Sequence, residues 1–176
     1  MDKQGHFGKD VASHDAYFLE PGFVYFSKDS GIVQTVLGSS VSVCLWDRVL
    51  KCGGISHFIE PTVTDPQKAT PKFGNVSTIV LIKMMIDAGC QKQNVVAQVF
   101  GGSFPEGGMG RDIGTDNVNS ASEILRRNGI NVVSTDTGGS IGRKIIFDIA
   151  TGHVAVLKVH KIRQDDWHSS CFGSAN

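Results

Sequence analysis

Three glycine-rich stretches, residues 35–41, 53–61 and 136–144, place hydroxyl, imidazole or backbone amide groups where a reaction could occur. In the first stretch, Gly38 permits a backbone path closed to other residues and leads two hydroxyl groups to the start of an expected strand. A nucleophile, or an amide that binds an oxyanion, could act from that position. An ordinary strand start explains the same pattern, so these residues alone leave both interpretations open.

The second stretch contains His57, between Ile55 and Ile59 on one face of an expected strand. A histidine in such a position is more often a hydrogen-bonded core residue than a base. Two adjacent strands could nevertheless bring His57 beside Ser40, which would give the contact between hydroxyl and imidazole that acyl chemistry needs.

The glycines do not form a nucleotide-binding loop. The spacing of Gly108, Gly110 and Gly114 misses the GxGxxG pattern by one residue. Residues 139–144 lack the glycine spacing and the final Lys-Ser/Thr of a phosphate-binding loop. Turns between strands explain these glycines, and residues 101–110 are expected to form a mobile surface loop.

The cysteines do not form a recognisable metal or redox site. None of them belongs to a CxxC pair. A set made of Cys44, Cys52 and His57 fits the spacing of no familiar metal site and lacks an evident fourth ligand. We therefore expect reduced structural thiols, no metal and no organic cofactor.

The composition limits the classes of partner. The chain has 17 Lys and Arg against 17 Asp and Glu, so no net field would attract nucleic acid or an anionic membrane. No run approaches the roughly 18 apolar residues of a membrane span, and the first residues contain no apolar signal-peptide core. We expect a monomeric cytoplasmic protein that is not embedded in a membrane and does not bind nucleic acid.

Polar termini flank one expected domain. Residues 1–18 are predicted to be a flexible N-terminal arm, residues 19–162 a single compact domain, and residues 163–176 a flexible C-terminal tail. Alternating or β-branched runs predict strands inside the domain. The predicted strands cover residues 40–45, 52–59, 95–100, 132–134, 144–149 and 154–159, with a hairpin turn at 150–153.

Two helices are expected between the strands. The first covers residues 75–88, begins with Asn75 as its cap, and is expected to turn Val76, Ile79, Val80 and Met84 to one face.

The second helix is expected to begin near Thr115 or Asp116, to end at Gly129, and to bury Val118, Ala121 and Leu125. Because a strand follows each helix, the order of elements favours an α/β layered sandwich with a mixed β-sheet and two main helices.

Residues 37–47 and 53–61 resemble the CheD chemoreceptor glutamine deamidases in both order and spacing. The resemblance continues through residues 100–103, 113–118, 136–139, 142–144 and 151–152. It spans roughly residues 20 to 160, which leaves both terminal arms outside it.

This resemblance implies an α/β sandwich that hydrolyses the side-chain amide of particular glutamines on methyl-accepting chemotaxis receptors, giving glutamate and ammonia. It implies a cysteine nucleophile at position 40, a histidine base at His57 and a supporting threonine at Thr35. Members of the family also associate with the CheC phosphatase, so a CheC-type partner is a further expectation.

Position 40 of this chain is a serine. A thiol has a reference pKa of about 8.5, whereas a serine hydroxyl is a far weaker nucleophile unless it is strongly activated. Cys44 cannot replace it, because four strand residues displace it by about 13 Å, at roughly 3.3 Å per residue.

Three interpretations fit the serine. It is a replacement that disables the enzyme, or it belongs to a natural variant that keeps binding to receptors or to a CheC-type phosphatase and has lost hydrolysis. A working serine amidase is the least favoured, because the sequence offers no identifiable carboxylate partner for His57.

Overall fold

The computed structural model describes residues 16–159. Residues 1–15 and 160–176 lie outside the described residues, and they contain most of the expected N-terminal arm and all of the expected C-terminal tail. Strand β1 (Tyr17–Phe18) pairs with strand β3, so the folded part begins before the expected boundary at residue 19.

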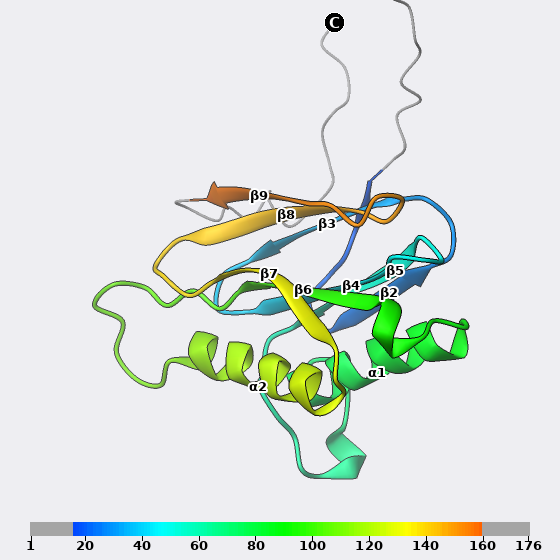
Figure 1. Cartoon of the computed structure of the whole chain (residues 1–176). Coiled ribbons are helices and arrows are strands. Elements are labelled where there is room, and N and C mark those ends of the chain that lie inside the picture. Colours follow the sequence, from blue (N-terminus) through cyan, green and yellow to red (C-terminus); the bar gives the residue numbers. More distant parts are fainter. Residues whose placement is uncertain (1–15, 160–176) are drawn as a thin grey trace, which may run out of the picture.

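The described residues form two stacked β-sheets, with two helices covering one of them (Figure 1). The four-stranded sheet has the order β1, β3 (Ile32–Leu37), β8 (Gly142–Asp148), β9 (Val154–Val159). The five-stranded sheet has the order β2 (Phe23–Ser27), β5 (Cys52–Phe58), β4 (Val41–Asp47), β6 (Val95–Gly101), β7 (Asn131–Thr137). The helices are α1 (Gly74–Asp87) and α2 (Ile113–Arg127), with short 3₁₀ turns at Pro66–Lys68 and Lys92–Asn94.

The predicted layered α/β sandwich is confirmed, with two mixed sheets in place of one. Strands β1 and β3 are parallel, as are β6 and β7, and the other neighbouring pairs are antiparallel. The expected hairpin at 150–153 joins β8 to β9, and the Gly152 N–H donates to the Asp148 carbonyl there.

Strand β4 is buried on both faces because its sheet lies between the helices and the second sheet. Val41, Val43 and Leu45 belong to the core beneath the helices. The small-residue face of the same strand turns to the other sheet, where Cys44 packs beside Ile55 in a second core. Alternation along β4 therefore separates two apolar cores, and both of its faces are shielded from water.

Helix α1 buries a different face from the one expected. Its buried side chains are Ser77, Thr78, Leu81, Ile82 and Met85, whereas Ile79 is 49% exposed. Apolar residues occur almost all round this helix, so the apolar pattern does not define one inward face.

The expected cap of α1 is also wrong. Asn75 lies inside the helix, and its side chain donates to the Val63 carbonyl and accepts from the Val63 N–H. Phe73 occupies the cap position without a side-chain hydrogen bond to the helix.

Helix α2 buries the predicted residues but begins earlier. Ala121 and Leu125 are fully buried, and Val118 packs partly against the same core. The cap is Asp112, whose carboxylate accepts from the Thr115 N–H at 2.9 Å. No helix in the described part of the chain is long and apolar enough to cross a membrane.

Candidate active site

The structure brings Ser40 and His57 into contact at one end of the sandwich. Ser40 ends the turn before β4, and His57 lies on β5 directly opposite Ser42. The Ser40 Oγ is 2.9 Å from the His57 Nε2. His57 is fully buried and Ser40 is 6% exposed, so the hydroxyl is the more accessible of the two groups.

Thr35 completes a chain of hydrogen bonds behind the histidine. Its Oγ1 lies 2.8 Å from the His57 Nδ1 and donates to the Leu19 carbonyl oxygen at 2.7 Å. Because a carbonyl only accepts and a hydroxyl has one hydrogen, the Thr35 oxygen accepts from a proton on Nδ1. The neutral imidazole then turns the lone pair of Nε2 to the Ser40 hydroxyl.

The three side chains come from both sheets and from the turn between them. Thr35 lies on β3 in the four-stranded sheet, and His57 lies on β5 in the five-stranded sheet. Both are fully buried. The site is thus built across the interface of the two sheets.

Burial lowers the pKa of His57 to about 4, and its hydrogen bond to the Leu19 carbonyl acts in the opposite direction. The imidazole is therefore uncharged at neutral pH. It can accept a proton from a neighbouring group, but the orienting group at Nδ1 is the Thr35 hydroxyl, which brings no negative charge to stabilise an imidazolium.

The turn before β4 offers backbone donors beside the Ser40 hydroxyl. Its carbonyls are already bonded: Gly38 accepts from the Ser103 N–H at 2.9 Å, and Ser40 accepts from the Gly102 N–H at 2.8 Å. The N–H groups of Ser39 and Ser40 donate to no other described residue. Two such N–H groups beside a nucleophile are the components of an oxyanion-binding site.

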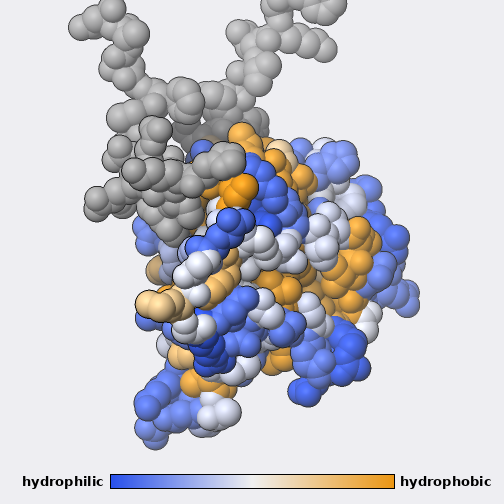
Figure 2. All heavy atoms as spheres, turned by 90° about the vertical axis from the view of Figure 1, so that its left-hand side faces the viewer, coloured by the Kyte–Doolittle hydropathy of each residue, from blue (hydrophilic) through white to orange (hydrophobic). Residues whose placement is uncertain are grey.

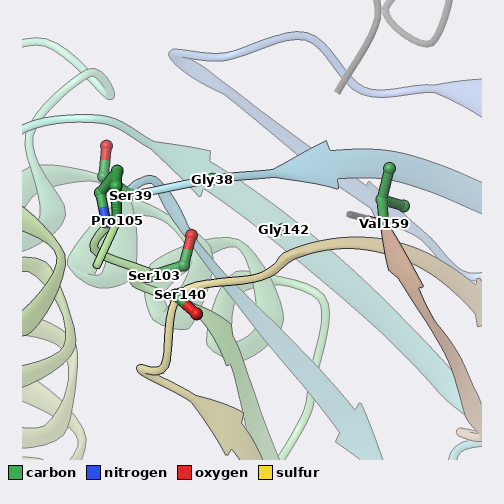
Figure 3. Close-up of a pocket in the computed structure, with 7 residues that line it drawn as sticks. All are labelled: Gly38, Ser39, Ser103, Pro105, Ser140, Gly142 and Val159. Atoms are coloured by element: carbon green, nitrogen blue, oxygen red, sulfur yellow. The ribbon is translucent and has the colours of Figure 1, made fainter. Parts of the chain in front are cut away.

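A recess of about 290 Å³ opens beside this turn (Figure 3). It lies at the end of the sandwich that is on the left in Figure 1 and faces the viewer in Figure 2, where polar and apolar residues are interspersed. Its lining consists of Gly38, Ser39, Ser103, Pro105, Ser140, Gly142 and Val159. No charged side chain is among these lining residues.

Ser103 is the most enclosed hydroxyl of the recess, with 6% exposure. Its side chain makes no hydrogen bond with another described residue. The family resemblance includes residues 100–103, but it does not indicate that the Ser103 hydroxyl lines a recess, because Ser103 begins a loop whose path is set by the two glycines before it. That loop forms part of the wall of the recess.

The third glycine-rich stretch forms another part of the wall and contributes no reactive group. Arg143 is 2% exposed, and its guanidinium donates to the Asp136 carboxylate and to the carbonyls of Gly138 and Ile141. Burial acts to raise the pKa of Asp136, but hydrogen bonds from Lys158 and Arg143 hold it below its usual value. This network fixes the turn that carries Ser140 into the recess.

The cysteines of the described residues, Cys44, Cys52 and Cys90, are buried free thiols outside the Ser40 site. Burial raises the pKa of Cys44, and burial together with the contact to Cys52 raises the pKa of Cys90 to about 12. Cys52 and Cys90 are in contact, with 3.5 Å between their sulfur atoms. Within residues 16–159, no group of three or more His, Cys, Asp or Glu side chains could hold a metal ion.

Comparison with known proteins identifies the family. Residues 60–158 match the family model described as CheD chemotactic sensory transduction. The chain belongs to the CheD family. Three CheD relatives bear the name probable chemoreceptor glutamine deamidase.

The similarity to these CheD proteins covers most of each chain. The one from Sulfurimonas denitrificans is 32% identical, over 84% of this chain and 97% of its own length. The one from Trichlorobacter lovleyi is 39% identical, over 78% of this chain and 87% of its own length. The one from Rhodospirillum rubrum is 38% identical, over 81% of both chains.

Proposed function

We propose that this protein is built as a glutamine deamidase of chemoreceptors, acting in the cytoplasm on the cytoplasmic domains of methyl-accepting chemotaxis receptors. The observation that carries this proposal is the hydrogen-bonded chain from Ser40 through His57 to Thr35, beside backbone N–H groups that donate to no other described residue. The names of the CheD relatives support the substrate class. Ser40 is the proposed nucleophile, His57 the base and Thr35 the orienting group.

The reaction follows from these groups. The Ser40 oxygen attacks the carboxamide carbon while the His57 Nε2 takes the hydroxyl proton. The N–H groups of Ser39 and Ser40 stabilise the oxyanion. His57 returns the proton to the departing nitrogen, which leaves as ammonia. Water, deprotonated by His57, then attacks the ester carbon, and His57 returns the proton to the Ser40 oxygen as glutamate leaves. These steps require neither a metal nor an organic cofactor.

The serine makes the first step slow. A base with a pKa of about 4 accepts a proton reluctantly, and a hydroxyl gives one up far less readily than a thiol. The resemblance to the CheD deamidases implies a cysteine at position 40, and a buried neutral histidine suits that more acidic group. We therefore expect hydrolysis by this chain to be impaired and to increase when a thiol is introduced there.

The recess is the proposed binding site for the glutamine side chain. Its hydroxyl groups can both donate to and accept from a carboxamide, and its uncharged lining suits a neutral amide better than the carboxylate product. Ser103→Ala is expected to raise KM for the receptor fragment about tenfold, since a lost hydrogen bond is worth roughly 1 kcal/mol or more. An unchanged KM in the Ser40→Cys background would contradict this assignment.

The deciding experiment is mass spectrometry of a receptor cytoplasmic fragment after incubation with the native chain or with Ser40→Cys. Conversion of glutamine to glutamate by Ser40→Cys but not by the native chain is expected. His57→Ala in the Ser40→Cys background is the matched control and should abolish conversion. Conversion that survives His57→Ala would place the chemistry elsewhere, and added chelator should have no effect.

The serine and the low pKa of His57 also favour a second function, a catalytically inactive binding module. Such a module would dock receptors or a CheC-type phosphatase, with the chain itself a monomer, and needs no nucleophile. Sedimentation of the chain with each candidate partner tests it. Tight binding together with no conversion by either form would favour the module over the deamidase.

A further inference from the structure

Asn117 connects helix α2 to both sides of the Ser40–His57 pair. It is fully buried, and its amide nitrogen donates to the Ser39 carbonyl at 3.0 Å and to the Ile59 carbonyl at 3.1 Å. An amide nitrogen has two hydrogens and can serve both carbonyls. Ser39 directly precedes Ser40, and Ile59 follows His57 by two residues, so one side chain joins the segments that carry the two reactive groups.

The hydrogen bond to Ser39 fixes the direction of the next N–H group. The Ser39 carbonyl and the Ser40 N–H belong to one planar peptide unit, and no cis peptide bond occurs among the described residues. The two groups of a trans unit point in opposite directions. With the Ser39 carbonyl held against α2, the Ser40 N–H points away from that helix. The recess is lined by Ser39, the residue before Ser40, and by no residue of α2.

The presence of an asparagine at position 117 also lowers the stability of the fold, so stability alone does not explain it. Its Oδ1 is buried and has no hydrogen-bond partner in the described structure. An unsatisfied buried acceptor lowers the stability of the fold, and an apolar side chain of similar size would avoid that cost. What the asparagine provides in return is the pair of N–H donors to the two carbonyls.

We propose that Asn117 is a positioning residue for the reaction. It holds the turn so that the Ser40 side chain meets His57 and the Ser40 N–H faces the bound carboxamide. The inference rests on the proposed function, because the group that it positions is the proposed nucleophile. Asn117 does not touch the substrate and acts only through the turn.

Ser120 provides the matched control. It lies one turn further along α2, is 9% exposed, and donates through its hydroxyl to the Pro61 carbonyl at 2.5 Å. Ser120→Ala therefore removes a helix-to-loop hydrogen bond of the same kind without affecting the carbonyl of Ser39. A purely structural role for Asn117 predicts that the two substitutions behave alike.

The test uses Ser40→Cys alone and combined with Asn117→Ala or with Ser120→Ala. The pH profile of alkylation by iodoacetamide at position 40 is measured by peptide-resolved mass spectrometry, and deamidation of the receptor fragment is measured in parallel. Asn117→Ala is expected to shift the midpoint of the alkylation profile and to lower the deamidation rate about tenfold to a hundredfold. Ser120→Ala is expected to leave both unchanged.

Coincident profiles for the Asn117→Ala and Ser120→Ala proteins would overturn the inference. If Ser40→Cys deamidates nothing, the proposed function fails, while a profile shifted only by Asn117→Ala still supports the positioning role. If Asn117→Ala does not fold, Asn117→Leu, which has a similar size and no hydrogen-bond donor, takes the place of Asn117→Ala in both measurements. An Asn117→Leu protein with the parent profile and rate would equally overturn the inference.

Discussion

At the scale of single residues, the Thr35 hydroxyl decides which nitrogen of His57 carries the proton. It donates to the Leu19 carbonyl and so can only accept from Nδ1. This leaves Nε2 as the acceptor for the group at position 40. A nonpolar side chain of the same shape would remove the hydroxyl that accepts from Nδ1 and keep the packing, with the Leu19 carbonyl as the remaining acceptor.

Thr35→Val in the Ser40→Cys background is accordingly expected to lower the deamidation rate about tenfold, since His57 loses a side-chain hydrogen bond that orients its ring toward position 40. Thr35→Ser keeps the hydroxyl and should retain most of the rate. Both rates are measured on the receptor fragment. Equal rates for the two variants would show that the hydroxyl has no orienting role.

The low pKa of His57 also makes stability depend on pH. Above pH 6.5 the imidazole is neutral in the folded and unfolded chains, and its contribution to stability is complete. As the pH falls from 6.5 towards 4, the unfolded chain takes up a proton that the folded chain does not. The free energy of unfolding should therefore decrease by roughly 3 kcal/mol across this interval.

Urea unfolding of the native chain and of His57→Gln, at a series of pH values between about 7 and 4, checks this expectation. Groups shared by the two proteins cancel in the difference. The native chain should lose the larger amount of stability on acidification. Parallel pH dependence would mean that the buried imidazole is not held neutral.

At the scale of elements, the sequence predicts which helices and strands form better than it predicts which of their faces are buried. The strand from Val41 and the helix that buries Leu125 are where the alternating and helical patterns place them. Strands β2 and β3 were not predicted, although the segment containing Thr35 was singled out for its chemistry. The prediction of which face of α1 is buried is wrong, because apolar residues surround the helix. Contacts with the sheet and with α2 select the buried face.

The glycines after β6 allow the loop that lines the recess to approach the nucleophile turn. Gly101 has a φ of 106°, and a Cβ there would overlap the Ser40 carbonyl oxygen. Gly107, in the loop that follows β6, has a φ of 74°, and a Cβ added there would meet no atom within 4 Å. Both glycines have a positive φ, but only at Gly101 would a Cβ overlap another atom. A comparison of alanine substitutions at the two positions therefore distinguishes the cost of backbone strain from the cost of steric overlap.

Gly101→Ala is expected to lower stability by several kcal/mol, or to prevent folding, whereas Gly107→Ala should cost only about 1 kcal/mol from its backbone conformation. Thermal unfolding of the two variants measures the difference. A Gly101→Ala protein as stable as Gly107→Ala would mean that β6 and the turn can separate without penalty.

At the scale of the whole molecule, the reactive groups depend on how the two sheets are held together. His57 and Thr35 belong to different sheets, and the core between the sheets sets their separation. The sequence could suggest that Ser40 and His57 meet, because neighbouring strands carry them. Its resemblance to the CheD deamidases includes the segments of Ser103 and Asn117, but it could not assign their roles, which arise only when α2 and the loop after β6 close over the same end of the sandwich.

Ile145 tests this core, since it is fully buried between the sheets and pairs with Thr35 in the register of β3 and β8. Ile145→Ala is expected to cost about 2–5 kcal/mol of stability. Leu157→Ala on the neighbouring strand β9 is the control: Leu157 is 49% exposed, and its loss should cost less than about 1 kcal/mol. Equal urea midpoints for the two variants would contradict this view of the core.

The contact between Ser40 and His57 also has an evolutionary consequence. The histidine, the orienting threonine and the surrounding turn are all in place. A cysteine nucleophile would require only that sulfur replace the oxygen of the side chain at position 40. Serine and cysteine codons can differ by a single base. Where the serine codon is one base from a cysteine codon, a single point mutation exchanges the nucleophile without remodelling any other part of the scaffold.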